Sequence, residues 1–169
     1  MYKRQNIGQP EKALEYYQEA LPIWREVGDP SGVATNLNNI GLVDEGIGEP
    51  QKALDYFQQA LLIWQEIGYR FGEGTTLNNI GVVYSRIGQP QKALEYYDKA
   101  LVISQEVGDR SGETTTFNNI GRIYYKKGQS QRALEYYDKA LVISQEVGDL
   151  SGKALTLNNI AYVLSLIHI

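Results

Sequence analysis

The stretch Thr75–Val107, TTLNNIGVVYSRIGQPQKALEYYDKALVISQEV, sets the pattern for the whole chain. Whole or partial copies of it recur with a spacing of 40 residues, so that Leu37, Leu77, Phe117 and Leu157 share one column. Glycine and alanine columns recur in the same register: Gly41, Gly81, Gly121 and Ala161, and Ala13, Ala53, Ala93 and Ala133. A constant period without insertions predicts one supersecondary unit stacked on itself.

Composition narrows the class of protein before any motif is considered. The 169 residues are 43% hydrophobic and 21% charged, with a formal net charge of −4. Such an acidic balance argues against a nucleic-acid partner, because binding phosphates requires a basic surface. The chain has no cysteine, so disulfides and thiolate metal sites are excluded. The N-terminus does not resemble a signal peptide and no apolar run could span a membrane, so we expect a cytoplasmic protein with no membrane partner.

Each unit contains two helical patterns. In the first, helix A, apolar residues Phe117, Ile120 and Tyr124 recur at helical spacing over about residues 113–127. The second, helix B, covers 91–107 and carries the small residues Ala93 and Ala100, which would let two helix axes approach closely. Short connections between helices of this length predict antiparallel neighbours, and the expected fold class is therefore all-α.

Glycine and proline separate the helices. Glycine suits the left-handed position that ends a helix, and it recurs at positions 28, 48, 68, 88, 108, 128 and 148. Pro50 and Pro90 follow two residues after such a glycine, as expected at the first position of the next helix. Ser31, Ser111 and Ser151 are predicted to cap the A helices.

The order Leu77, Ile80, Gly81, Tyr84, Ala93, Tyr97 and Ala100 resembles the tetratricopeptide repeat. The usual unit has about 34 residues, and the longer unit here is similar to the arrays of kinesin light chain, Pins/LGN-type adaptors and bacterial signalling proteins. The resemblance covers the whole chain. It implies a right-handed α-solenoid whose A helices line a concave surface that binds a protein or peptide.

The period divides the chain into a single array, 1–169. We expect a partial repeat at 1–28, full repeats at 29–68, 69–108 and 109–148, and a lone helix A at 149–169. Because both ends cut a unit, we expect a fragment of a longer array. The terminal LIHI fits no column, which leaves open whether it is native, and the apolar final helix could mediate self-association.

Two further expectations concern single units. Asp44 replaces the tyrosine of later units, and Gly46 weakens the same helix, so the first full helix A is the expected weak point. Trp24 and Trp64 lie on the apolar side of helix B and are interpreted as core residues.

In similar arrays the inward-facing positions of helix A bind ligand. Those positions hold Thr75, Asn78, Asn79, Val82, Ser85 and Arg86 in one unit, and Thr115, Asn118, Asn119, Arg122, Tyr125 and Lys126 in the next. An asparagine pair recurs at 38–39, 78–79, 118–119 and 158–159. An asparagine amide can satisfy both the N–H and the C=O of an extended backbone. By resemblance, the second of each pair would bind peptide: Asn39, Asn79, Asn119 and Asn159. The alternative is that these amides bond a neighbouring helix, and the first members, Asn78 and Asn118 among them, are weaker candidates.

Charge is graded along the expected groove. Asp44 and Glu45 precede Arg86, and Arg122 and Lys126 follow in the third unit. A peptide acidic toward the third repeat would be attracted to such a field. The alternative is that the lysines only complement the dipole at a helix C-terminus.

Nothing in the sequence points to catalysis, a metal or a cofactor. His168 is the only histidine, and the Gly-Gln-Pro turns join helices rather than follow strands, so they are no phosphate loop. We therefore expect a non-enzymatic scaffold that binds an extended peptide in the groove. The alternative is a spacer that associates through its exposed terminal helices.

Overall fold

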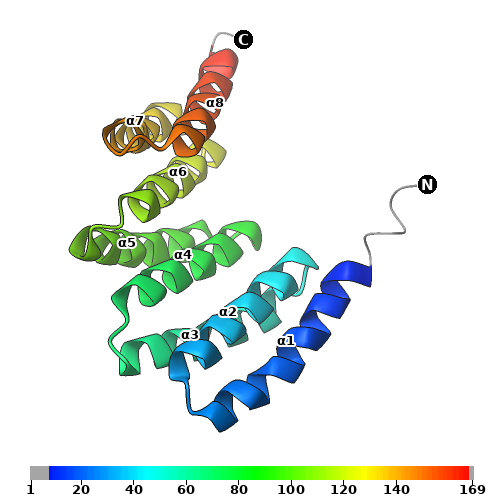
Figure 1. Ribbon diagram of the computed structural model, residues 1–169. Coiled ribbons are helices and arrows are strands. Elements are labelled where there is room, and N and C mark those ends of the chain that lie inside the picture. The colour runs from blue at the N-terminus through cyan, green and yellow to red at the C-terminus, as the bar shows by residue number, and fades with distance from the viewer. Residues whose placement is uncertain (1–7, 168–169) are drawn as a thin grey trace.

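The computed structural model describes residues 8–167, and this part of the chain contains eight helices and no strand (Figure 1). They are α1 (Gly8–Val27), α2 (Pro30–Gly46), α3 (Pro50–Glu66), α4 (Arg70–Arg86), α5 (Pro90–Val107), α6 (Arg110–Lys126), α7 (Ser130–Glu146) and α8 (Leu150–Ile167). Successive helices run antiparallel and stack into an open right-handed solenoid. The predicted all-α fold is confirmed. The α2, α4, α6 and α8 helices are A helices, and the others are B helices.

Every connection has the same geometry, which the α4–α5 turn illustrates. Gly88 has φ = 75°, and the N–H of Gln89 donates to the carbonyl oxygen of Tyr84 at 2.9 Å. Glycine reaches this left-handed conformation without strain and so closes the helix. Pro90 begins the next helix, as predicted. The other predicted cap glycines also have positive φ: Gly28, Gly48, Gly68, Gly108, Gly128 and Gly148.

The prediction that serines cap the A helices is wrong. Helix α6 begins at Arg110, and the carboxylate of Asp109 accepts from the backbone N–H of Gly112 at 2.9 Å. Asp149 binds Gly152 in the same way at 2.9 Å. Because Gly108 completes the previous helix, the aspartate directly after it already lies at the cap position. Ser111 is therefore inside the helix.

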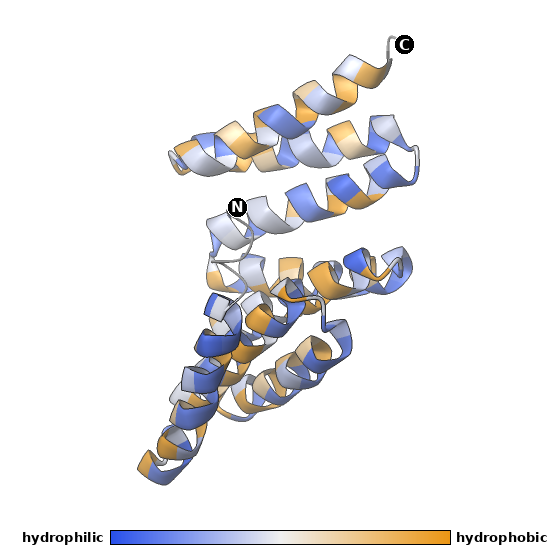
Figure 2. Ribbon diagram, turned by 90° about the vertical axis from the view of Figure 1, so that its right-hand side faces the viewer, coloured by the Kyte–Doolittle hydropathy of each residue, from blue (hydrophilic) through white to orange (hydrophobic). Residues whose placement is uncertain are grey.

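Small residues let the two helices of a unit meet. A Cβ added to Gly81 would lie 2.5 Å from a ring carbon of Tyr97, which no real contact allows. Ala93 and Ala100 are fully buried in the same layer of the fold, as their column predicts. The core is a series of small clusters between neighbouring helices, and Figure 2 shows apolar residues recurring along the helices rather than gathered at one centre. This arrangement is typical of repeat arrays, in which each unit contacts only its neighbours.

The contacts between units define an inner and an outer layer. The backbones of consecutive A helices approach one another closely along α2, α4, α6 and α8, whereas those of consecutive B helices in the described chain lie further apart. Closer spacing on the A side curves the stack toward that side. The A helices therefore form the concave surface and the B helices the convex one.

Burial corrects two sequence-based interpretations. Trp64 is buried at 5% exposure between α2 and α4, but Trp24 is 39% exposed because α1 packs only against α2 within the described chain. Asp44 is 2% exposed and therefore does not face the groove.

No helix of the described residues is long and apolar enough to cross a membrane.

Candidate functional site

Each A helix presents a column of polar side chains that the packing leaves partly exposed. Thr35, Thr75 and Thr115 occupy equivalent exposed positions near the start of α2, α4 and α6. One turn further along lie the half-buried second asparagines, Asn39, Asn79 and Asn119. Because the A helices touch in order, these columns run side by side across the concave surface. The result is a continuous polar lining of hydroxyl and amide groups.

The asparagine pairs join neighbouring units through hydrogen bonds. The side-chain oxygen of Asn38 accepts from the hydroxyl of Thr76 and from the amide of Asn79, both at 3.3 Å. The next unit repeats this with Asn78, which accepts from Thr116 at 3.5 Å and from Asn119 at 3.1 Å. The first asparagine of each pair thus binds the next unit.

The asparagine hydrogen bonds between units continue to α8, with one change. Asn118 accepts from the amide of Asn159 at 2.9 Å and donates its own amide to the hydroxyl of Thr156 at 2.8 Å. Asn118 is 5% exposed, so its amide serves packing rather than the groove. As in the alternative interpretation, asparagine amides bond a neighbouring helix, and they do so at six of the eight positions: Asn38, Asn78, Asn79, Asn118, Asn119 and Asn159. Contact between the second asparagines and a peptide stays a prediction.

The predicted cations have different environments. Arg86 of α4 forms an ion pair with Glu45 of α2, so each neutralises the other across two units. Arg122 donates to the side-chain oxygen of Asn119 at 3.3 Å and remains exposed, as does Lys126. Since Asp44 is buried, the graded field predicted from the sequence is reduced to a cationic end at α6.

A buried tyrosine hydroxyl lies near this cationic end. Tyr97 is fully buried, and burial raises the pKa of its hydroxyl to about 12, while the guanidinium groups of Arg122 and Arg86 partly oppose that rise. The hydroxyl is therefore neutral at physiological pH. Arg122 forms no ion pair with the described residues, so its positive charge is available in the groove.

A hollow of about 230 Å³ lies between α4 and α6, near the N-terminal ends of these two helices. Most of its lining residues are serine, threonine or asparagine; the full lining is Phe71, Gly74, Thr75, Asn78, Ser104, Asp109, Ser111, Gly112, Thr115 and Thr116. The predicted residues Thr75, Asn78 and Thr115 are brought together here. Arg86 and Lys126 lie outside this lining, at the C-terminal ends of their helices.

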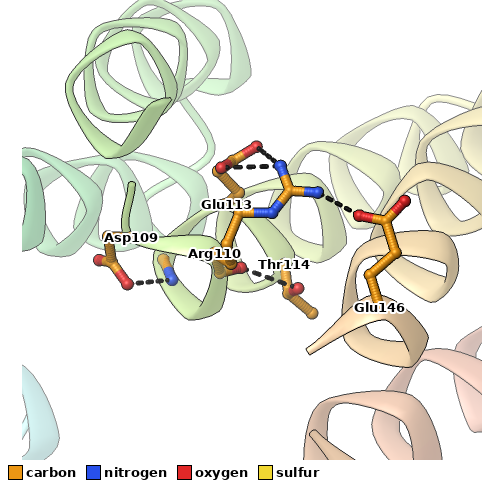
Figure 3. A network of polar contacts seen from close by, with 6 residues as sticks. Asp109, Arg110, Glu113, Thr114 and Glu146 are labelled. Atoms are coloured by element: carbon orange, nitrogen blue, oxygen red, sulfur yellow. Dashed lines mark hydrogen bonds and ion pairs between the residues drawn. The ribbon is translucent and has the colours of Figure 1, made fainter. Parts of the chain in front are cut away.

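The sequence interpretation missed an ionic network on the opposite side of the A helices. The guanidinium of Arg110 donates to both carboxylate oxygens of Glu113 at 3.1 Å and also binds Glu146 of α7 (Figure 3). Arg70 links Glu73 and Glu106 in the same way. The signal was an Arg-x-x-Glu repeated in two units, with a further glutamate 36 residues after the arginine. Its role is to join a helix A to the following B helix.

Residues 8–166 contain no cluster of three or more acidic or histidine side chains that could hold a metal ion. His168, the only histidine of the chain, lies outside the described residues.

A family model described as tetratricopeptide repeat matches residues 4–66, 32–106, 72–146 and 112–168. These overlapping matches cover nearly the whole chain. A search of curated protein sequences found no match.

Solved structures share the fold. BtubC (BKLC) from P. vanneervenii is 25% identical with a TM-score of 0.82, and the match covers 96% of this chain and 68% of that one. A Podosopora anserina kinesin light chain-like protein with nearly identical TPR-like repeats is 16% identical with a TM-score of 0.73, covering 95% and 80%. A Rap protein complexed with Competence and Sporulation Factor is 18% identical with a TM-score of 0.81, covering 95% of this chain and 48% of that one. The chain thus spans about half of the Rap protein.

Proposed function

Because the chain belongs to the tetratricopeptide repeat family, we propose that it is a protein-interaction scaffold that holds an extended peptide in its concave groove. In this proposal the protein acts by binding and not by catalysis. The partner is a protein segment without secondary structure, since the groove offers regularly spaced amides and hydroxyls rather than an apolar trench.

One observation carries the proposal: the polar columns on the inner face continue from α2 to α6 without interruption. The bonds to Asn38 and Asn78 each use one N–H of Asn79 and Asn119. The amide of each second asparagine has a second N–H, and an extended backbone presents complementary groups at regular intervals. Each such bond adds roughly 0.5–1.5 kcal/mol, so affinity would come from several units acting together.

Charge would orient the peptide. The exposed cations Arg122 and Lys126 lie at the α6 end, whereas Arg86 is already paired with Glu45. Complementary charges increase the association rate and select the register of a ligand. We therefore expect the bound segment to be acidic where it passes α6.

Binding of a partner by this fold has a precedent among the neighbours. The Rap protein of similar fold was solved in a complex with Competence and Sporulation Factor. That likeness supports a binding role for the array.

A second candidate function is association through the terminal helix. Several large apolar side chains of α8 are more than 40% exposed: Leu150, Leu155, Leu157, Tyr162, Leu164 and Leu166. Exposed apolar surface of this extent is typical of contact surfaces. In this alternative, the array is a spacer and α8 makes the contact.

The groove proposal is tested by selecting displayed random peptides against the protein and measuring the selected sequences by fluorescence anisotropy. We expect enrichment of aspartate and glutamate, and binding about tenfold weaker for Arg122→Glu/Lys126→Glu, because a like charge then faces the ligand. Selected sequences without acidic enrichment, or unaffected by that variant, would contradict the charge preference.

The asparagine contacts need a matched control, because these amides also join the units. Asn79→Ala/Asn119→Ala and Asn38→Ala/Asn78→Ala both remove the inter-unit bonds to Asn38 and Asn78. Only the first pair removes amides of the second asparagines. We expect the first pair to weaken peptide binding more than the second at equal helical content. Equal weakening would mean that the asparagines act only through packing.

A further inference from the structure

The convex face contains a cleft between α3 and α5 whose floor is Leu77 of α4. Its volume is about 520 Å³, within the range of sites that hold small ligands or side chains. Apolar side chains form its walls, and charged ones form the rim. The lining residues are Leu61, Gln65, Arg70, Glu73, Leu77, Tyr96, Asp98, Lys99, Val102 and Ile103.

The residues that line the cleft recur one unit later with a single change. Every lining residue has an identical counterpart 40 positions further on, except that Phe117 replaces Leu77. Leu77 packs with Ala100, Ile103, Leu61 and Tyr96. Phe117 packs with the equivalents of those four residues: Ala140, Ile143, Leu101 and Tyr136. Phe117 therefore shows how an aromatic ring packs at the position that Leu77 occupies one unit earlier.

In the following unit the ring of Phe117 contacts two side chains of α7. Its centroid lies 6.2 Å from that of Tyr136, and the ammonium of Lys139 lies 5.7 Å from it. In the cleft over Leu77 the corresponding Tyr96 and Lys99 are present, with Lys99 5.1 Å from the Tyr96 ring. A cation is attracted to the negative face of an aromatic ring. Tyr96 and Lys99, the counterparts of the two side chains that contact the Phe117 ring, are thus present beside Leu77, which is not aromatic.

The charged residues at the rim of the cleft indicate which type of residue would lie next to the inserted ring in a partner. Arg70 is bound to Glu73 and Glu106, whereas Asp98 forms no ion pair with the described residues. Asp98 is part of the lining, so a cation next to the inserted ring would reach it. Lys99, which would contact the ring, disfavours a second cation at its own side of the cleft.

We propose that the cleft over Leu77 is a second docking site, on the face opposite the groove, for a phenylalanine side chain of a partner protein with a basic residue beside it. The site takes the ring where the next unit holds its own Phe117. This site does not depend on the concave groove, so the chain could hold two segments at once.

The test titrates the dipeptide N-acetyl-Phe-Lys-amide into protein with labelled methyl groups and follows the shifts by NMR. We expect saturable shifts of the methyl groups of Leu77, Val102 and Ile103. Leu77→Phe fills the cleft with the residue that the next unit already accommodates, and we expect it to abolish the saturable shifts at Val102 and Ile103. The reciprocal variant Phe117→Leu should add a second site, reported by Val142 and Ile143.

Matched probes separate the contributions of ring and charge. N-acetyl-cyclohexylalanyl-Lys-amide keeps the size of the side chain but lacks the ring electrons, and it should bind roughly two- to fivefold more weakly. N-acetyl-Phe-Glu-amide should also bind more weakly, and Asp98→Asn should remove that difference. The proposal is overturned if the shifts at Val102 and Ile103 are absent or persist unchanged in Leu77→Phe. Because groove variants such as Asn79→Ala leave this cleft intact, failure here is distinguishable from failure of the groove proposal.

Discussion

Two glycines in A helices have opposite effects on the fold. Gly81 lies against the ring of Tyr97, whereas a Cβ on Gly46 would meet nothing within 4 Å. Glycine costs backbone entropy in any helix. At position 81 that cost is accepted because only glycine lets α4 and α5 approach, and at position 46 nothing compensates it. Ala161 of α8 occupies the column of Gly81 and is exposed.

Gly81→Ala should therefore destabilise the protein by about 1–3 kcal/mol, because the added methyl group forces α4 and α5 apart. Gly46→Ala should stabilise it by about 0.5 kcal/mol, because it only removes flexibility of the unfolded chain. Urea denaturation followed by circular dichroism measures both. Two variants shifted in the same direction would show that helix propensity, and not packing, dominates at position 81.

Asp44 is a second residue at odds with its surroundings. It is buried, one of its carboxylate oxygens has no hydrogen-bond partner in the described chain, and burial raises its pKa although Lys52 partly opposes this. The equivalent Tyr84 instead stacks on Tyr96, with ring centroids 5.4 Å apart. The sequence-based prediction of a weak point in α2 agrees with this environment.

We expect Asp44→Tyr to stabilise the protein by about 1 kcal/mol at pH 7, because it replaces a buried charge with an aromatic contact. A raised folded-state pKa means that the native protein binds the proton more tightly than the unfolded chain. The penalty in the wild type is therefore complete above the folded pKa, and it is lost as the pH falls to the unfolded value near 4. Urea titrations at pH 7 and pH 4 should show the advantage of the variant shrinking on acidification. An advantage that does not change with pH would rule out the charge as its cause.

At the scale of the element, Arg70 joins α4 to α5, and Arg110 joins α6 to α7. Glu113 is 3% exposed, so its carboxylate depends on Arg110, whereas Glu146 lies on the exposed side of the network. A buried carboxylate without a partner is costly, but an exposed ion pair contributes little. The two ion pairs of Arg110 are therefore unequal in their contribution to stability.

Arg110→Met should destabilise the protein, since Glu113 is left unpaired, although solvent relieves part of that penalty. The control Glu146→Gln should cost less than about 0.5 kcal/mol. Thermal and urea denaturation compare the two. Adding Glu113→Gln to Arg110→Met should recover stability, and a further loss would contradict this assignment.

At the scale of the whole molecule, the array has no single core, and each helix depends on its immediate neighbours. Helix α8 packs on α6 and α7, where Val163 is buried against Ala133 and Tyr137. Its other apolar side chains, Leu155 and Leu164 among them, are exposed. Polar substitutions at Leu155 and Leu164 would therefore test association without unfolding the helix. A polar substitution at the buried Val163 would instead disturb the packing of α8.

If α8 mediates self-association, Leu155→Glu/Leu164→Glu should lower the weight-average mass measured by sedimentation equilibrium. The control Leu62→Glu, which changes an equally exposed side chain of α3, should not. A wild type that is monomeric at every concentration measured would contradict the spacer alternative.

The sequence by itself determined the helix pairs, the glycine turns and the column in which each residue lies. These follow from local rules: the 3.6-residue period, the φ that glycine permits and the small residues required where helices cross. Only the tertiary structure decided what those columns meet. The asparagines form hydrogen bonds to residues 41 positions away, and the arginines to residues 36 positions away. Asp44 is buried, and Leu77 forms the floor of a cleft. These contacts depend on the angle and separation between neighbouring units, and the period of the sequence specifies neither.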